Sequence, residues 1–124
     1  MDRKMFIEKV DGVCGIKSMK EVAYILGVSE NTVFYRMNKN EFFSIPFNGD
    51  YLFPAFQFKN GKVIDGLADI LYILGDISPE AKCTFFLNPL FSNSDKKISD
   101  YLSDYPDSFE AIKLEATFYL RMGG

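Results

Sequence analysis

The spacing of apolar residues changes twice along this chain of 124 residues, and the changes indicate three regions. Between residues 19 and 37, apolar residues recur every three or four positions, as along one face of an α-helix. Within residues 43–58 apolar residues occupy every second position in two short stretches, a pattern typical of β-strands. From residue 61 onward the helical spacing returns in four stretches. The pattern predicts a mainly α fold, with a helix-turn-helix followed by a small β-hairpin and a bundle of about four short helices.

The first helical region predicts two short helices joined by a tight turn. Ser18 and Glu21 have the spacing of a capping box, in which each side chain bonds to the other residue's backbone N–H. Gly27 can adopt the left-handed conformation that ends a helix, and Ser29 can cap the next helix. With Val33 placed to face the first helix, this is the spacing of a helix-turn-helix, although two unrelated capped helices would look similar.

The first 17 residues contain Phe6, Ile7 and Val10, which are enough for a short helix or an arm that packs on a neighbour. Gly12 and Gly15 are then expected to break it. A dimer-forming arm and a frayed terminus both fit this segment.

The alternating region predicts a hairpin that turns at Asn48-Gly49, a pair that tolerates positive φ angles. Pro46 and Pro54 restrict its strands to sheet edges or short ribbons. Directly after a helix-turn-helix, a hairpin occupies the place of a DNA-contacting wing. It can equally cover the apolar backs of the helices, and the two roles are compatible. Gln57, among aromatic residues, is expected to bond to backbone groups that join the hairpin to the helices, with a direct binding role as the alternative.

Residues 59–124 are expected to form a helical domain, separate from a helix-turn-helix unit with hairpin in residues 1–58. The first of its four helices is predicted to be capped by Asp65 and to end at Gly75, and the second to begin at Ser78-Pro79-Glu80 and end at Asn88. The third is predicted to run from about Asp95 and to stop at Pro106. Asp107 or Ser108 is predicted to cap the fourth. Phe91, Tyr105 and Phe118 exceed what these short helices can bury. Surplus apolar surface of this kind suggests an interface with a partner.

The composition argues against an enzyme or a metalloprotein. The chain has no histidine, which removes the usual general base and zinc ligand. Cys14 and Cys83 lack the paired spacing of a zinc site. We therefore predict no catalytic residues, no metal site and no cofactor. No stretch has the length of a transmembrane helix, and the charged start does not resemble a signal peptide, which favours a cytoplasmic protein without membrane contact.

The net charge of −3 argues against a nucleic-acid partner, but the charge is unevenly distributed. Residues 1–40 carry seven Lys/Arg and five Asp/Glu, a balance of +2, whereas residues 41–124 carry seven and twelve, a balance of −5. Because DNA attracts basic surfaces, docking through the first part of the chain is permitted.

One further stretch carries a family resemblance. The segment Phe53-Pro54-Ala55-Phe56-Gln57-Phe58, followed by Gly61 and Gly66-Leu67, lies in a run from Leu26 to Leu71 that resembles the Xre/MbcA/ParS-type antitoxins of bacteria. The resemblance implies a DNA-binding N-terminal part and a C-terminal helical domain that neutralises a toxin, commonly of the NAD-consuming RES class. Toward the C-terminus it is fainter, because Leu90-Phe91-Ser92-Asn93 replaces the family's glycine loop.

The outward residues of the second helix are the candidate DNA contacts, should that helix enter a major groove. They are Ser29, Glu30, Asn31, Thr32, Phe34, Tyr35, Arg36, Asn38 and Lys39. Asn31 could bond adenine and Glu30 could accept from cytosine, but both also fit capping of the helix start. Phe34 alternatively packs on the hairpin. Two cations, Arg36 and Lys39, are few for one recognition helix, so tight binding would need a dimer that reads two half-sites.

The predicted function is a DNA-binding transcriptional regulator, the antitoxin of a type II toxin-antitoxin pair that represses its own operon. Its predicted partners are double-stranded DNA, a RES-type toxin bound by the C-terminal helices, and a second copy in a homodimer. Two alternatives stay open: an excisionase-like or phage-type DNA-binding factor without a toxin, and a protein–protein adaptor that does not bind DNA.

Overall fold

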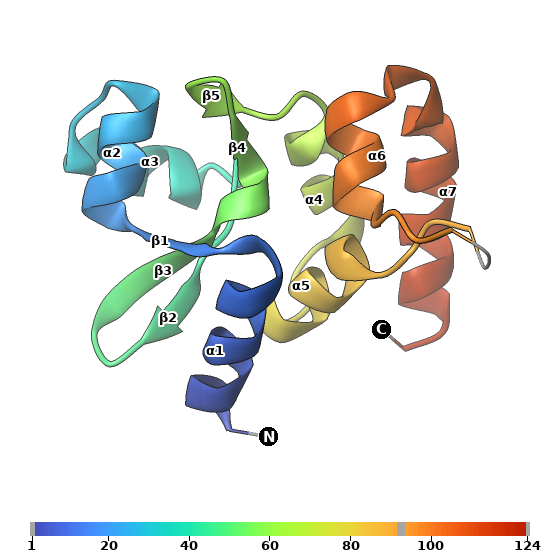
Figure 1. Cartoon of the computed structure of the whole chain (residues 1–124), viewed down its shortest axis with the longest axis horizontal. Helices are drawn as coiled ribbons and strands as arrows, with labels where there is room; N and C mark the ends of the chain where they lie inside the picture. The colour runs from blue at the N-terminus through green and yellow to red at the C-terminus, as the bar shows by residue number, and fades with distance from the viewer. Residues whose placement is uncertain (1, 92–93, 124) are drawn as a thin grey trace. The chain divides into compact units, whose positions relative to one another are not determined.

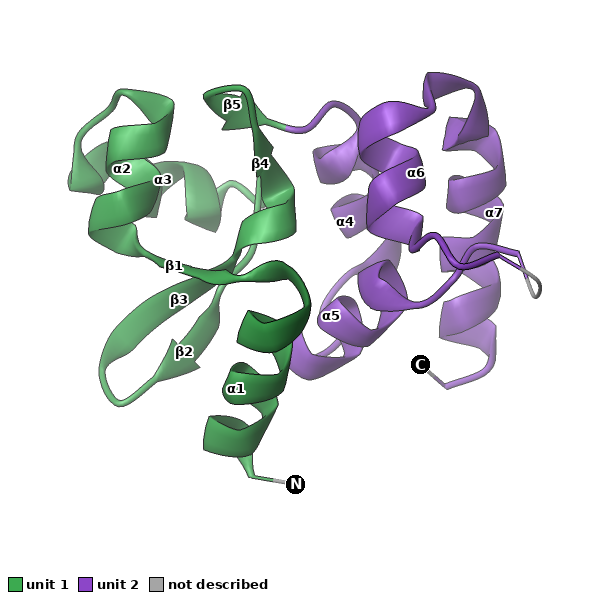
Figure 2. Cartoon of the chain, viewed as in Figure 1, with its two compact units in different colours: residues 1–63 green, residues 64–124 purple. Residues whose placement is uncertain are grey.

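Seven α-helices and five short strands occur in residues 2–91 and 94–123, the part of the chain that the computed structural model describes (Figure 1). They form two compact units, Met1–Val63 and Ile64–Gly124 (Figure 2). The predicted mainly α fold, with a helix-turn-helix, a hairpin and four further helices, is confirmed. The units divide five residues after the predicted boundary, because the strand pair β4 (Phe58–Lys59) and β5 (Lys62–Val63) packs through β5 on helix α2 (Met19–Leu26).

The first unit contains three helices and a three-stranded sheet besides this strand pair. Its elements are α1 (Arg3–Cys14), β1 (Ile16–Ser18), α2, α3 (Glu30–Asn38), β2 (Ile45–Phe47), β3 (Asp50–Pro54), a short 3-10 turn η1 (Ala55–Gln57), β4 and β5.

Helix α1 is the short helix that the first 17 residues were expected to form. Asp2 caps it, accepting the Met5 N–H at 2.8 Å. The predicted break at Gly12 is wrong, because the helix continues through it and ends at Gly15, whose φ of 90° suits glycine alone. The chain then enters strand β1, which the sequence pattern did not predict.

Helices α2 and α3 form the helix-turn-helix. The Ser18–Glu21 capping box is present: the Ser18 N–H donates to the Glu21 carboxylate at 2.8 Å, and the Glu21 N–H donates to the Ser18 hydroxyl at 3.1 Å. Gly27 ends α2 with a left-handed φ of 68°, and Ser29 caps α3. Val33 is fully buried. The predicted signals and the observed boundaries therefore agree.

The sheet has three antiparallel strands in the order β1-β3-β2. Asn48 and Gly49 make the predicted turn between β2 and β3, with φ angles of 50° and 82°. Pro46 lies in the edge strand β2, as expected. Of the two placements expected for Pro54, a sheet edge is wrong, because β3 is the central strand; β3 is short, with five residues, and Pro54 is its last residue, paired with Ile16 of β1.

Gln57 is fully buried and makes the predicted bonds to backbone groups. Its side-chain oxygen accepts the Phe43 N–H at 2.8 Å, and its amide nitrogen donates to the Phe43 and Pro54 carbonyls at 2.9 and 3.1 Å. One side chain thus joins the segment after α3 to the end of β3. The neighbouring rings of Phe42 and Phe53 are also fully buried, 5.8 Å apart and edge-on, so the base of the hairpin covers the core.

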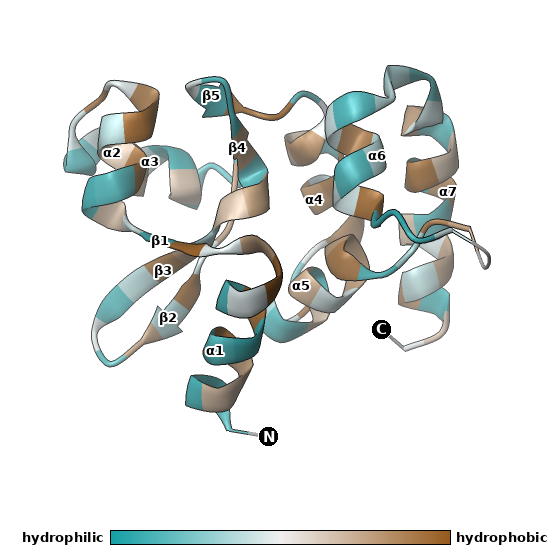
Figure 3. Ribbon diagram, viewed as in Figure 1, coloured by the Kyte–Doolittle hydropathy of each residue, from teal (hydrophilic) through white to brown (hydrophobic). Residues whose placement is uncertain are grey.

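The second unit is a bundle of four helices. They are α4 (Leu67–Leu74), α5 (Pro79–Leu87), α6 (Ile98–Asp104) and α7 (Phe109–Arg121), and the short 3-10 turn η2 (Pro106–Ser108) lies between the last two. Brown, hydrophobic shades predominate along α4 in Figure 3, and α4 and α7 pack together. The core residues of this unit with no more than about 2% exposure are Leu67, Ile70, Leu71, Leu74, Cys83, Phe85, Phe86, Ile98, Ile112 and Ala116.

Helix boundaries in this unit follow the prediction where capping is local. Ser78 caps α5 and accepts the Ala81 N–H at 3.1 Å. The predicted cap at Asp65 is wrong, because the residue at the start of α4 is Gly66, with φ 84° and no side-chain cap. Ser108 is the N-cap residue of α7, one of the two predicted positions, but its side chain makes no capping bond, because η2 leads directly into α7. The third helix begins at Ile98 instead of near Asp95.

Phe91, Tyr105 and Phe118 are exposed, as the surplus of aromatic residues predicted. Within residues 2–91 and 94–123, no helix combines the length and apolar character needed to cross a membrane.

Candidate nucleic-acid interface

The α2–α3 pair fixes which face of α3 is open to a ligand. The Val28 N–H donates to the Ala23 carbonyl at 3.0 Å, which holds the turn between the helices. Val22 of α2 and Val33 of α3 are both fully buried. Because Val33 faces inward, the residues half a turn away on α3 must face outward.

Ser29, one of the predicted contact residues, caps the start of α3 through its bonds to Thr32. The Ser29 hydroxyl accepts the Thr32 N–H at 3.1 Å and lies 3.0 Å from the Thr32 hydroxyl. Glu30 and Asn31 follow in the first turn and are exposed. Since Ser29 supplies the side-chain cap, Glu30 and Asn31 are not required for capping, and their side chains are accessible to a base edge.

The middle of α3 presents two aromatic residues. Phe34 and Tyr35 are both exposed. The Phe34 ring meets Tyr51 of β3 edge-on at 5.7 Å, so it also packs on the hairpin, as the alternative interpretation held. The Lys39 ammonium lies 5.3 Å from the centre of the Tyr35 ring, a cation–π contact. Asn38 and Lys39 at the end of the helix are exposed.

Arg36 differs from the other candidates because its charge is already paired. Its Nε donates to the Glu41 carboxylate at 2.8 Å, and its side chain is only 29% exposed. The guanidinium also lies 5.8 Å from the centre of the buried Phe42 ring. Sequence reasoning missed Glu41, which stands five residues away and beyond the end of the helix. Lys39, the residue directly after α3, is exposed and therefore more accessible to a phosphate than Arg36.

The hairpin tip carries no positive charge. Asn48, Gly49 and Asp50 are exposed there, and residues 42–58 contain no Lys or Arg. Arg3 supports the hairpin from α1, its guanidinium donating to the Pro46 carbonyl at 3.0 Å. A wing that enters a minor groove commonly uses cations, so this hairpin offers little to attract a phosphate backbone.

The remaining cations of the first unit lie largely outside α3. Lys17 is in β1 and Lys20 in the first turn of α2, on the two sides of the α2 cap. The first unit has nine Lys/Arg and seven Asp/Glu, a balance of +2, and the second has five and ten, a balance of −5. The charge difference therefore coincides with the structural division.

The described residues hold no group of three or more His, Cys, Asp or Glu side chains that could bind a metal ion. Together, the fold is a helix-turn-helix unit with a short hairpin, joined to a four-helix unit. No family model and no curated protein matches this chain. Among solved structures, it is similar to the NMR structure of Rv2175c, with a TM-score of 0.65 over 84% of this chain and 80% of that one. At 19% sequence identity, this likeness shows a shared fold.

Proposed function

We propose that this protein is a DNA-binding transcriptional regulator that places α3 in a major groove. The observation that carries the proposal is the outward face of α3, where Asn31, Tyr35 and Asn38 are exposed on a helix held in a helix-turn-helix. Asparagine side chains can bond both edge groups of adenine, and tyrosine can contact a phosphate or a thymine methyl group. Such a regulator acts in the cytoplasm and needs no cofactor.

Phosphate binding in this proposal comes from few cations. Lys17 and Lys20 near the start of α2 and Lys39 at the end of α3 are the candidates. Each phosphate neutralised adds about 0.9 to the slope of log K against log salt, so three contacts give a slope of about −3 per copy. That is modest, and it supports a dimer on two half-sites as the binding species.

The antitoxin role is a narrower proposal that rests on the segment Phe53–Phe58. Its glutamine, Gln57, is fully buried among backbone groups, so the segment supports the fold of the first unit and does not itself identify a toxin. Under this proposal the four-helix unit binds a RES-type toxin. Without a toxin, the same first unit would serve an excisionase-like or phage-type factor.

A protein–protein adaptor is the second candidate function. It is favoured by the pairing of Arg36 with Glu41, the acidic hairpin tip and the exposed aromatic rings of Tyr24 and Tyr35. An adaptor would use this aromatic surface for a protein and would show no affinity for a duplex.

The test is a fluorescence-anisotropy titration of the full chain against the DNA upstream of its own gene, at two salt concentrations. We expect saturable binding that weakens with salt and exceeds binding to a scrambled duplex. Lys39→Ala should weaken binding to both duplexes similarly, because it removes a phosphate contact, whereas Lys4→Ala on α1 is the matched control. Flat curves at both salt concentrations would exclude the regulator and leave the adaptor.

A further inference from the structure

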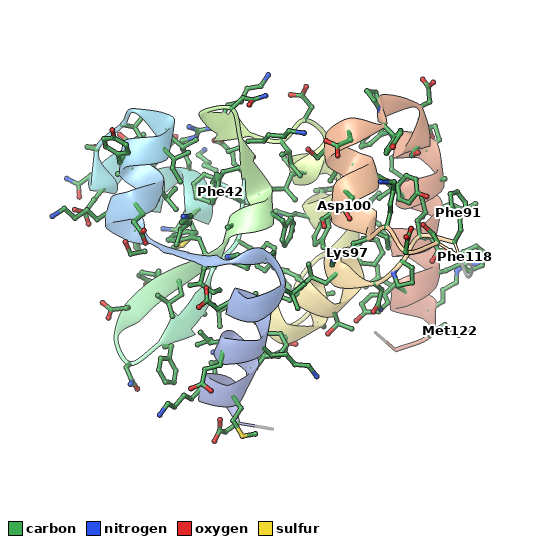
Figure 4. All side chains as sticks on the ribbon, viewed as in Figure 1. Phe42, Phe91, Lys97, Asp100, Phe118 and Met122 are labelled. Carbon is green, nitrogen blue, oxygen red and sulfur yellow. The ribbon has the colours of Figure 1, made fainter. Side chains whose placement is uncertain are left out.

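Helix α7 has apolar residues on its outer face as well as on its inner one. Ile112 and Ala116 are fully buried against the bundle, whereas Leu114, Phe118 and Met122 are 61%, 48% and 85% exposed. Leu114, Phe118 and Met122 are spaced four residues apart and so form one stripe along the helix. Met122 is the residue directly after the end of α7. Figure 4 shows Phe118 and Met122 at the same edge of the view, together with the exposed ring of Phe91. A helix with apolar residues on both faces usually has both faces covered.

The charges around this stripe indicate what covers it. Residues 109–121 contain two acidic and two basic side chains, so α7 is neutral in a unit with a balance of −5. One basic residue, Lys113, is paired with Glu110 at 3.1 Å. A basic partner would be drawn to the acidic remainder of the unit. The stripe itself is uncharged and α7 is neutral, so a second α7 can pack along it without opposing net charges at the contact.

The arrangement of the stripe is also self-complementary. Leu114 and Met122 stand four residues before and after Phe118, so a two-fold axis beside Phe118 would bring each Leu114 opposite the Met122 of the other copy. Isologous contacts of this kind are the commonest way in which proteins form dimers. We infer that the exposed stripe Leu114–Phe118–Met122 is a homodimer interface, in which α7 packs antiparallel on α7 of a second copy.

This inference deepens the proposed function, which needs two copies for two half-sites, but its evidence is the surface of α7. A helix of 13 residues is about 20 Å long, so contact along this one helix buries less area than the roughly 1,200–2,000 Å² of a stable interface. We therefore expect a weak dimer in free solution, with a dissociation constant of about 10–100 μM, that becomes tighter when both copies are bound to one duplex.

The test is sedimentation equilibrium of the full chain, at concentrations up to about 0.5 mM and without DNA. The average mass should rise from one copy to two. Phe118→Glu should raise the dimer dissociation constant at least tenfold, because it places two carboxylates at the two-fold axis. Met122→Glu, at a more exposed position, should do the same and guards against a folding defect. Met5→Glu is the matched control, because Met5 is an exposed apolar residue of α1.

A chain that stays monomeric at the highest concentration, or a dimer that persists in both stripe variants, would overturn the inference. If the chain stays monomeric, the exposed stripe would instead be a binding surface for a different protein. Because the measurement contains no DNA, it is independent of the titration above. If the chain forms a dimer but does not bind DNA, the proposed function is wrong and this interface stands. If the chain binds DNA but stays monomeric, the interface is wrong and the proposed function stands.

Discussion

The Arg36 guanidinium is bonded to the Glu41 carboxylate, with 2.8 Å between Nε and Oε1. The backbone completes this arrangement, because the Glu41 N–H donates to the Arg36 carbonyl at 3.2 Å. Asn40, between α3 and Glu41, adopts a positive φ of 64° that turns the chain back toward the helix. Glu41, a residue outside α3, thus pairs with Arg36, the cation within that helix.

Under the proposed function, this pairing predicts that Glu41 weakens binding to DNA. Glu41→Gln removes the negative charge and leaves Arg36 available to a phosphate, so binding should strengthen several-fold at low salt. The salt slope should become steeper by about one unit. Anisotropy titrations at several salt concentrations measure both quantities.

Glu8→Gln on α1 is the control for the change in net charge, because Glu8 is exposed and distant in sequence from α3. Equal effects of the two substitutions on affinity and slope would show that Arg36 does not reach the duplex.

The buried Gln57 predicts a large loss of stability when its amide is removed. Gln57→Leu removes the bonds that the Gln57 amide makes to the Phe43 N–H and to the carbonyls of Phe43 and Pro54. We expect a loss of about 2–4 kcal/mol in the free energy of unfolding, measured with urea. Asn38→Ala, which removes an exposed amide, should change the same quantity by less than about 0.5 kcal/mol. Similar midpoints for the two variants would contradict the role assigned to Gln57.

The capping box predicts a pH dependence of stability. The Ser18 backbone N–H, and then its hydroxyl, bond to the Glu21 carboxylate and lower its pKa below the usual value. Since the folded pKa is the lower one, this contribution is present above the unfolded pKa and is lost as the pH falls through the folded pKa. Glu21→Gln keeps a hydrogen-bonding cap without titrating.

Thermal unfolding from pH 7 down to pH 3 tests this expectation. The wild-type chain should lose more stability than Glu21→Gln over the acidic part of this range. Parallel curves for the two proteins would remove the link between Glu21 and the loss.

Gly66 predicts a position where even alanine is destabilising. Its φ is 84°, and a Cβ atom there would lie 2.7 Å from the Phe109 ring and 3.2 Å from a Leu102 methyl group. Gly66→Ala should cost about 2–4 kcal/mol, the sum of backbone strain and overpacking. Gly27→Ala separates the two causes, because Gly27 is also left-handed but has open space around it, and it should cost about 1 kcal/mol. Equal losses in urea unfolding would show that the ring moves aside.

The sequence predicted helix ends and turns correctly where the residue that causes them lies within a few positions of the backbone that it affects. The caps at Ser18 and Ser29, the stop at Gly27 and the Asn48-Gly49 turn each act within about four residues. The cap at Asp65 failed because Gly66, the next residue, occupies the start of α4 with its own positive φ.

Features that depend on distant segments were missed. Strand β1 has three residues and no period of its own, and its partners in β3 lie more than thirty residues away. The outward face of α3 follows from the helical phase set by Val33, so the exposure of Asn31 and Asn38 was predictable. The pairing of Arg36 with Glu41 was not, because it depends on the reversal of the chain at Asn40.

The central position of β3 also has a consequence for the order of folding. The β2–β3 hairpin closes over a two-residue turn, whereas pairing Ser18 of β1 with Leu52 of β3 closes a loop of 33 intervening residues. Short loops close sooner, so one edge of β3 stays open until β1 arrives. An open strand edge can pair with another chain and begin aggregation. The segment from α1 to β1 therefore acts during folding as the cover of this edge.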